Sequence, residues 1–229
     1  MPNKLRLESP GFLHLLPREI VAKLTQAGTV MHYHDQQLIH SRGDYKPGLS
    51  IVLSGTVYAA VGDPDGRLLI AGMLGNGHCF GEFTLFAQLP RTHDISAVGA
   101  TDILQIPAGA FMTLFDAEPK IAQALMKSTL LRMHLLLEIL DAMRRLPLIP
   151  RTAKILLTML YSSGMVDYVP CKQSELADTV GVTRISLGKA LQALQEKQLI
   201  KLGYGKIHFP DIAKFEDWVE QACQGTAMK

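Results

Sequence analysis

The sequence predicts an α+β chain: an N-terminal antiparallel β-roll, a long helix, and a C-terminal domain of short helices with a small hairpin. Short β-branched runs divided by Gly, Asp and Pro fill residues 28–107, and helical periodicity replaces them at Pro119. The length of 229 residues, with 48% hydrophobic and 19% charged residues, is enough for two modest cores. We expect domains at residues 1–118, 119–146 and 147–229.

The β-roll is predicted mainly from one hairpin pattern. "LSIVLSGTVYAAV" (49–61) is β-branched and partly alternating, "DPDG" (63–66) is a turn signal, and "RLLIAGML" (67–74) follows it. Further strands are expected near 29–33 and 101–106. Several short strands at this spacing are typical of a small antiparallel barrel or roll.

The long helix is predicted over residues 119–145, which hold no Gly or Pro after the first position. At 1.5 Å per residue it would be about 40 Å long. The a/d spacing of a helix that pairs with another helix runs along it, through Ala122, Met126, Thr129, Met133, Leu136, Leu140 and Met143. We therefore expect a homodimer interface made by the six side chains from Met126 to Met143. The alternative is a single helix buried in a monomer core. A second stripe is expected to face the chain's own barrel: Leu125, Leu130 and Leu137.

Two further segments mark the domain boundary and the C-terminus. "RRLPLIPRT" (144–152) interrupts the helix with two prolines and is predicted to be a hinge between domains. A helix is expected at about 151–162. In "DIAKFEDWVEQA" (211–222) apolar side chains line one face, which predicts a terminal helix packed on the C-terminal domain.

Charge is distributed unevenly along the chain. Lys and Arg number 11 against 13 Asp and Glu over residues 1–143, 10 against 4 over residues 144–210, and 2 against 4 over residues 211–229. The basic excess in the middle block is typical of a module that binds a polyanion. An ordinary solvated surface is the alternative.

Several classes of protein are not expected. "MPNKLRLESPGF" at the start has no apolar signal-peptide core, and no apolar run approaches the roughly 18 residues needed to span a bilayer. The three cysteines form no CxxC pair, so disulfides are not expected. No Walker loop, GxSxG or HExxH motif is present. We expect a cytoplasmic protein that is not an enzyme and has no membrane partner.

"KQSELADTVGVTRISLGKALQALQEKQLI" (172–200) has the pattern of a helix-turn-helix. Gly181 suits a tight turn that needs positive φ, and Thr183 is a good N-cap for a second helix. The expected buried faces are Leu176, Ala177 and Val180 on the first helix, and Leu187, Ala190, Leu191 and Leu194 on the second. "KLGYGKIHF" (201–209) is expected to form a small β-wing. The pattern therefore favours a winged helix-turn-helix that binds DNA over an ordinary helical hairpin.

The predicted DNA contacts lie on the outward edge of this motif. Arg184 suits a guanine through its forked donors, and Ile185 suits a thymine methyl. The full predicted set is Gln173, Ser174, Thr183, Arg184, Ile185, Ser186, Lys189 and Lys206. We expect a homodimer to place two recognition helices about 34 Å apart on double-stranded DNA with a near-palindromic site.

"FGEFTLFAQLPRTHDI" (80–95) places a Gly-Glu pair ten residues ahead of an Arg-Thr pair, on either side of a short helical segment. With this segment, the chain resembles the cyclic-AMP-receptor and fumarate-nitrate-reductase-regulator (CRP/FNR) superfamily over about residues 12–210. The pieces that carry the resemblance occur in the superfamily's order: "GLSIVLSGTV", "FGE…LF…RT", the long helix and "VGVTRISLGKALQAL".

The resemblance implies a cyclic-nucleotide-binding-like jelly roll that senses a small molecule, a dimerisation helix, a winged helix-turn-helix that reads DNA, and RNA polymerase as a candidate further partner. It also implies that Gly81 offers backbone N–H groups and that Glu82 accepts from a ribose hydroxyl. Arg91 and Thr92 would hold a cyclic phosphate. The alternative for Glu82 and Arg91 is an internal salt bridge that holds the barrel mouth.

Two departures from the family pattern leave the effector open. His93 stands where a small residue follows the Arg-Ser/Thr pair in the family, and Leu136 and Leu137 occupy the positions of a Thr-Ser pair that holds adenine. Neither leucine can hydrogen-bond a base. The expected effector is therefore unknown: cyclic AMP or another cyclic nucleotide, a different small molecule, or none.

A haem- or redox-sensing regulator of the same fold is the alternative function. Relatives that hold an iron–sulfur cluster use N-terminal cysteines, but Cys79 is the first cysteine here, so such a cluster is not expected. His78 and Cys79 are neighbours on a strand and would point to opposite faces, which disfavours shared iron ligation. His32, His34 and His40 lack acidic or cysteine ligands at supporting spacing, so no metal site is predicted.

Overall fold

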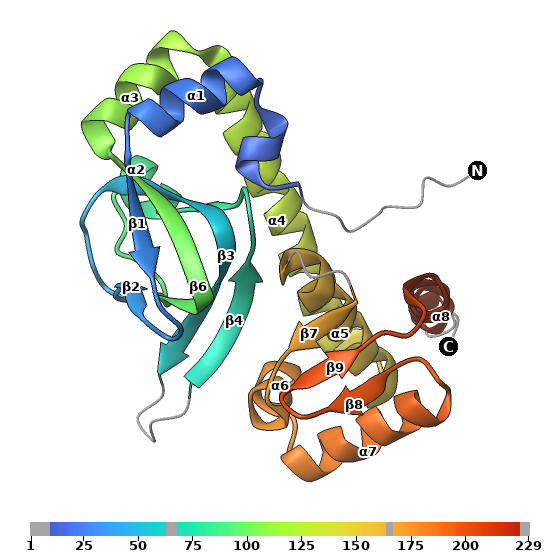
Figure 1. Ribbon diagram of the computed structural model, residues 1–229. Coiled ribbons are helices and arrows are strands. Elements are labelled where there is room, and N and C mark those ends of the chain that lie inside the picture. Colours follow the sequence, from blue (N-terminus) through green and yellow to red (C-terminus); the bar gives the residue numbers. More distant parts are fainter. Residues whose placement is uncertain (1–9, 63–67, 164–166, 225–229) are drawn as a thin grey trace. The chain divides into compact units, whose positions relative to one another are not determined.

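The computed structural model describes residues 10–62, 68–163 and 167–224, and the chain divides into two compact units, one built on Glu8–Arg132 and the other on Met133–Lys229 (Figure 1). The boundary falls inside α4 (Pro119–Arg145), so this helix contributes to both units. Each unit has its own hydrophobic core. The predicted boundaries near 118 and 146 stay predictions.

The first unit is an antiparallel sheet rolled on itself. Its strands are β1 (Thr29–Tyr33), β2 (Leu38–His40), β3 (Gly48–Gly62), β4 (Leu68–Leu74), β5 (Cys79–Phe80) and β6 (Asp94–Pro107). The order along the sheet is β1-β6-β3-β4, with β2 paired to β6 and β5 paired to β3. The two longest strands form the spine of the roll, because Gly48 pairs with Pro107 at one end and Ala60 with Asp94 at the other.

The strand β3 bends through an irregular register near Gly55. Pairing with β6 shifts between Val52 and Ser54 and again between Ser54 and Thr56. Gly55 has φ 77°, and a Cβ there would lie 2.6 Å from the Ala100 carbonyl oxygen. Only glycine fits this bulge without strain, and the bulge lets one long strand curve around the barrel.

Helices close one end of the roll. The 3-10 helix Phe12–Leu15 is followed by α1 (Arg18–Gln26), which packs on α3 (Ala108–Ala117). A second core forms where these helices and the start of α4 meet the sheet, through Phe12, Leu24, Phe111 and Ile121 among others. The sequence analysis did not predict α1 or α3. It did predict the hairpin of β3 and β4, although the turn "DPDG" lies outside the described residues.

The long helix α4 has the predicted bounds, Pro119–Arg145. Its buried side chains include Ile121, Ala124, Leu125, Ser128 and Leu135. The predicted second stripe is wrong at Leu130 and Leu137, which are 51% and 56% exposed. Five residues separate Leu125 from Leu130, and at about 100° per residue this turns the side chain roughly 140° away from the buried face.

The second unit contains α5 (Leu148–Ser163), α6 (Gln173–Val180), α7 (Arg184–Glu196), α8 (Ile212–Gln224) and a three-stranded sheet. The sheet order is β7-β9-β8, made by β7 (Tyr168–Pro170), β8 (Lys201–Gly203) and β9 (Lys206–His208). Helix α5 begins three residues before the predicted start, because Pro150 lies in its first turn, where proline removes no needed hydrogen bond. The core of this unit joins all four helices and the sheet.

No helix in the described ranges is long and apolar enough to cross a membrane.

Candidate functional site

The short helix α2 (Glu82–Phe86) places Glu82 beside the long helix. Gly81 precedes it with φ 107°, and a Cβ on this glycine would lie 2.4 Å from the Gly48 carbonyl oxygen. The close approach of β3 therefore requires glycine at this position. Glu82 is then the first residue of α2 and its carboxylate faces Arg132 on α4.

Arg132 holds this corner through two contacts. One guanidinium nitrogen pairs with Glu82 Oε1, and Nη1 donates to the Cys79 carbonyl oxygen over 2.8 Å. Burial opposes the charge on Arg132, but Glu82 outweighs it and the pKa of Arg132 is raised. The cation that pairs with Glu82 is thus Arg132, which the sequence analysis did not single out. An isolated arginine in a helical pattern gives no local signal of such a contact.

Arg91 is a buried cation with spare donors. Arg91 is only 7% exposed, and its Nη2 donates to the Lys46 carbonyl oxygen over 3.3 Å. Its backbone N–H and C=O bond to Asp44 and Gly43 in the loop before β3. Burial lowers its pKa, with Asp44 and Glu82 acting in the opposite direction. Nε has no hydrogen-bond partner among the described residues. A buried guanidinium with an unused donor is suited to an anion.

Thr84 and Thr92 differ in their surroundings. Thr84 on α2 is 5% exposed and its hydroxyl has no partner among the described residues. Thr92 is exposed, and its hydroxyl lies 2.8 Å from His93 Nδ1. The structure thus reveals a buried hydroxyl at Thr84 that sequence reasoning missed, while the predicted hydroxyl of Thr92 is turned toward its neighbour.

The interior of the roll contains a small apolar cluster on which His40 packs. Val52, Val57, Phe80, Ile95 and Ile103 form the cluster.

His40 packs edge-on against Phe80 with ring centroids 5.6 Å apart, and its Nε2 lies 2.9 Å from the Ser50 hydroxyl. Burial first, and then the charge of Arg91, lower the pKa of His40 to about 4. The imidazole is therefore neutral at pH 7, which leaves Arg91 as the cation of this interior.

The histidines and cysteines do not gather into a metal site. Within the described ranges no group of three or more His, Cys, Asp or Glu side chains could hold an ion. His32 Nδ1 lies 2.6 Å from Asp102 Oδ1, a partner that strand pairing supplies and sequence spacing does not reveal. Cys79 is fully buried and its thiol donates to Glu82 over 3.4 Å. Burial raises the pKa of this thiol well above its ordinary value.

The helix-turn-helix has the geometry that its residues predict. Gly181 ends α6 in the left-handed region with φ 74°, and Val182 N–H donates to the Ala177 carbonyl oxygen over 2.9 Å. Thr183 caps α7 by accepting from the Ser186 N–H over 3.2 Å. All seven side chains expected to be buried are buried: Leu176, Ala177, Val180, Leu187, Ala190, Leu191 and Leu194.

Three of the predicted DNA-contact residues lie on the outward edge of α7 and take no part in its N-cap. Arg184, Ile185 and Lys189 are exposed, and Ile185 reaches 76%. By contrast, the hydroxyls of Thr183 and Ser186 bond to each other over 3.0 Å at the cap. A single exposed isoleucine is ordinary on a protein surface, so Ile185 is of interest for its place beside Arg184 on the free edge of α7.

The remaining predicted contacts flank α7. Gln173 and Ser174 are exposed in the first turn of α6. Lys206 is exposed on β9, with its Nζ 5.6 Å from the centre of the Tyr168 ring. Tyr204, at the turn between β8 and β9, is fully exposed. The unit therefore presents cations and one open aromatic ring beside the free edge of α7.

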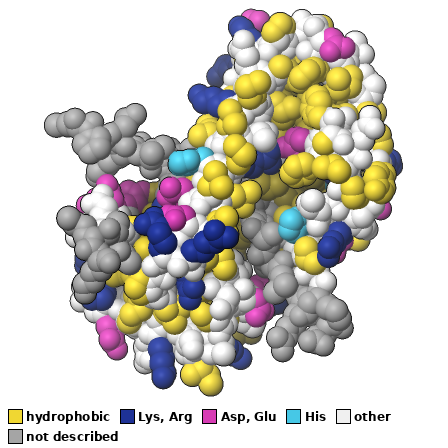
Figure 2. Space-filling model, turned by 180° about the vertical axis from the view of Figure 1, so that it is seen from behind, with side chains coloured by type: hydrophobic (Ala, Val, Ile, Leu, Met, Phe, Trp, Pro, Cys, Tyr) yellow, Lys and Arg dark blue, Asp and Glu magenta, His cyan; other side chains and the backbone are white. Residues whose placement is uncertain are grey.

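The predicted pairing row of α4 is open in the single chain. Met126, Met133, Leu136, Leu140 and Met143 are between 38% and 64% exposed, and Thr129 is exposed between them. Hydrophobic side chains lie open on the face drawn in Figure 2. A row of this length is more than the isolated apolar residues that a monomer normally exposes.

Comparison with known proteins identifies both units. A cyclic nucleotide-binding domain model matches residues 30–118, and a Crp-like helix-turn-helix domain model matches residues 150–218. The cyclic AMP receptor protein of Thermus thermophilus is 26% identical over 212 residues, which cover 91% of this chain and 96% of that protein.

Solved structures share the fold. FixK2 from Bradyrhizobium japonicum superposes with a TM-score of 0.68 at 17% identity, covering 83% of this chain and 96% of FixK2. The c-di-GMP-responsive global regulator CLP from Xanthomonas campestris gives a TM-score of 0.67 at 20% identity, covering 84% of this chain and 99% of CLP.

The family models match in the order that the sequence analysis predicted, with the long helix α4 between them. The resemblance and the predicted α+β fold are therefore confirmed. The chain belongs to the CRP/FNR superfamily of bacterial transcription regulators.

Proposed function

We propose that this regulator works as a homodimer that reads a near-palindromic DNA site with α7 and that its β-roll binds an anionic small molecule. The observation that carries the proposal is the division of α7 into two faces. One face is buried in the core of its unit, while Arg184, Ile185 and Lys189 stand free on the other.

Base reading is assigned to the free edge of α7. The guanidinium of Arg184 can donate two hydrogen bonds to guanine O6 and N7, and Ile185 can pack on a thymine methyl. Lys189 follows one turn later and is assigned to a base or a phosphate. Gln173, Ser174 and Lys206 flank this edge and are assigned to the phosphate backbone, which positions the motif without reading sequence.

Thr183 and Ser186 are assigned an indirect role in this interface. Their hydroxyls already satisfy each other and the first turn of α7. They hold the start of the recognition helix in place, and the backbone N–H groups there are directed toward a phosphate.

Dimerisation is assigned to the open row of α4. Its apolar side chains recur at four- and three-residue steps from Met126 to Met143, over about 26 Å. A second copy of the same helix has a row of the same length, spacing and apolar character. Pairing the two rows would remove both from water. Two copies would present two α7 helices to successive major grooves about 34 Å apart.

The effector is assigned by the chemistry of two buried groups in the β-roll. A buried guanidinium with an unused donor and the orphaned hydroxyl of Thr84 both favour a phosphate-like anion. The Thermus relative is named a cyclic AMP receptor and the Xanthomonas neighbour a c-di-GMP-responsive regulator. We therefore place cyclic nucleotides first among candidate effectors. Leu136 and Leu137 argue against an adenine contact from α4, because they offer no hydrogen bond.

A haem or redox function is not adopted. The Cys79 thiol is fully buried, and burial holds it protonated, whereas the thiolate is the form that binds metal or reacts with an oxidant. A transcription regulator acts on RNA polymerase, either by contacting it or by blocking its access to the promoter. We therefore propose RNA polymerase as the further partner, and the cytoplasm as the place of action.

Selection of binding sequences from random duplex DNA tests the proposal. The purified full chain should enrich two inverted half-sites whose centres lie about 10 base pairs apart, with affinity that falls steeply as salt rises. Enrichment of a single unpaired half-site would contradict the dimer. Binding without sequence preference would contradict the assignment of α7.

A further inference from the structure

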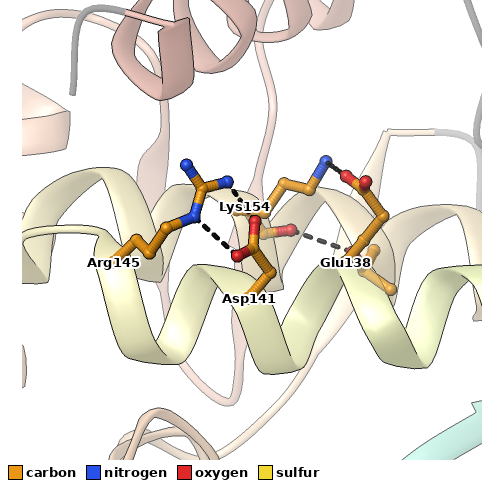
Figure 3. Close-up of polar contacts among 5 residues, drawn as sticks. Glu138, Asp141, Arg145 and Lys154 are labelled. Atoms are coloured by element: carbon orange, nitrogen blue, oxygen red, sulfur yellow. Dashed lines mark hydrogen bonds and ion pairs between the residues drawn. The ribbon is translucent and has the colours of Figure 1, made fainter. Parts of the chain in front are cut away.

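The C-terminal half of α4 is bonded to α5, the next helix along the chain. Both belong to the second unit, which carries the helix-turn-helix and is called the DNA-binding unit below. Glu138 on α4 and Lys154 on α5 form an ion pair, with 3.0 Å between Oε2 and Nζ (Figure 3). The Lys154 side chain is only 14% exposed, and that of Glu138 is 43% exposed. A half-buried ion pair between two helices restricts their relative orientation, because both partners lose free energy if they separate without new partners.

Further contacts join the same two helices beside this pair. Arg151 on α5 donates from Nη1 to the Met143 carbonyl oxygen over 3.2 Å, which satisfies a free acceptor in the last turn of α4. Ala142 and Leu146 are 4% and 9% exposed. Leu146 N–H still donates to Ala142 over 3.0 Å, so helical bonding continues to the junction.

Two other segments of the DNA-binding unit reach this junction. A Cβ on Gly181, in the turn of the helix-turn-helix, would lie 3.7 Å from the Met143 methyl carbon. On α8, burial raises the pKa of Cys223, and Lys154 and Glu138 are among the charges that act on its thiol. Phe215 and Val219 of α8 are buried in the same core as Ile155 of α5. The ion pair therefore lies where α4, α5 and α8 meet.

We propose that Glu138 and Lys154 are positioning residues for DNA reading: they fix the angle between the C-terminal half of α4 and α5. Through α5, on which α7 packs, they fix the separation of the two recognition helices in the dimer. The inference rests on the proposed dimer. It differs from the hinge predicted at "RRLPLIPRT", because an ion pair and a hydrogen bond join α4 to α5 across Pro147 and Pro150.

A neighbouring ion pair provides a matched control. Asp141 and Arg145 pair within α4, four residues apart, and both side chains are about half exposed (Figure 3). This pair carries the same charges at nearly the same place, and its hydrogen bonds stay within α4, whereas Lys154 acts on Asp141 through its charge alone. Its loss should leave the angle between α4 and α5 unchanged.

The test measures spacing preference rather than affinity alone. The full-length wild-type protein, Glu138→Gln, Lys154→Met and Asp141→Asn are titrated against duplexes whose two half-sites are at the selected spacing or moved by one base pair either way. Each protein is also titrated against a duplex with one half-site. Equal melting temperatures and equal sedimentation as dimers serve as checks that the variants are folded.

In Glu138→Gln and Lys154→Met, we expect the ratio of affinities for the selected and shifted spacings to fall about fivefold. This factor corresponds to the free energy of a partly exposed ion pair. Affinity for the single half-site should stay within about twofold, because α7 itself is unchanged. Asp141→Asn should match wild type. The charge reversal Glu138→Lys with Lys154→Glu should restore the preference, since it rebuilds the pair with opposite polarity.

Three outcomes would overturn the inference. The first is a wild-type spacing preference in Lys154→Met. The second is an equal loss on the single half-site, which would make the pair a purely structural contact. The third is the same loss in Asp141→Asn. A monomeric wild-type protein would instead overturn the proposed function, so the two failures are distinguishable.

Discussion

Arg132 pairs with the carboxylate of Glu82 although fifty residues separate them in the sequence. The same guanidinium donates to the Cys79 carbonyl oxygen. One side chain of α4 thus holds both the last strand before α2 and the first residue of α2. This fixes the segment that leads to Arg91, because Gly81 packs between Gly48 and the Arg91 guanidinium.

Arg132→Met should destabilise the β-roll. Glu82 and Arg132 side chains are 15% and 25% exposed, so the variant leaves a largely buried carboxylate without its cation. We expect the free energy of unfolding to fall by roughly 2–4 kcal/mol. Urea unfolding followed by far-ultraviolet circular dichroism measures this, while fluorescence of Trp218 reports on the other unit. Adding Glu82→Gln should recover most of the loss. A double variant as unstable as Arg132→Met would show that the pair is not the cause.

Stability should fall with acid because of His78. Burial first, and then the charges of Arg132 and His14, lower the pKa of this histidine to about 4 from an ordinary value of 6.5. The unfolded chain therefore binds a proton between pH 6.5 and 4 that the folded chain does not. The stabilisation is complete above pH 6.5 and is lost as the pH falls toward 4. It amounts to about 2 kcal/mol between pH 7 and pH 5.

Urea unfolding at pH 7 and pH 5 measures this dependence on His78. His78→Gln should remove roughly the stated difference between the two pH values, whatever its own effect at pH 7. His34→Asn is the matched control, because the His34 side chain is exposed. An unaltered acid dependence in His78→Gln would assign the effect to other groups.

Local patterns were sufficient for α4 and for the helix-turn-helix. Pro119 and Pro147 bracket a stretch without Gly or Pro, and this predicted both ends of α4 to the residue. Gly181 and Thr183 are local signals for the turn and cap between α6 and α7, and the structure has both. Each of these features depends on residues within one or two helical turns of each other.

Contacts between distant segments could not be predicted in the same way. The alternative considered for Glu82 and Arg91 was an internal salt bridge between them; the structure pairs Glu82 with Arg132 instead. From the sequence, Leu130 and Leu137 were expected to be part of a buried stripe. Which face of α4 is buried depends on packing against distant segments, and both leucines are exposed. The strand β7 has only three residues, so it is recognised only through its pairing with β9.

Arg184→Ala should relax the sequence specificity at one base. Loss of a bidentate contact to guanine should cost about 1–3 kcal/mol on the selected site and nearly nothing on a site with that base changed. Fluorescence anisotropy with both duplexes measures the two affinities. Lys197→Ala, at the far end of α7, should match wild type on both. If Arg184→Ala retained full discrimination, the assigned recognition edge would be wrong.

Leu136→Glu should dissociate the proposed dimer. The leucine is 61% exposed in the single chain and central in the α4 row, so pairing two copies would bury two carboxylates without partners. We expect the dimer dissociation constant to rise about 100-fold or more, as measured by sedimentation equilibrium. Lys127→Glu places a carboxylate on an exposed side chain of α4 outside the row and changes the net charge by two rather than one, and it should remain dimeric. A monomeric Lys127→Glu would mean that net charge, not burial, separates the copies.

Thr84→Val separates the role of Thr84 in ligand binding from its role in stability. Valine keeps the shape of threonine but removes a buried hydroxyl that has no partner among the described residues. Free of ligand, the variant should be as stable as wild type or more stable by up to about 1 kcal/mol, because an unpaired buried polar group has been removed. If the hydroxyl contacts an anionic effector, the same change should weaken binding by about tenfold.

Thermal-shift titrations with cyclic AMP, cyclic GMP, c-di-GMP and inorganic phosphate test this prediction. Arg91→Gln should abolish any shift seen with wild type, since it removes the buried cation. Thr84→Val should reduce the shift without lowering the melting temperature of the free protein. These opposite effects on binding and stability distinguish a ligand contact from a packing position. A nucleotide shift that survives in both variants would place the effector elsewhere than beside Arg91, because a phosphate bound there needs that charge.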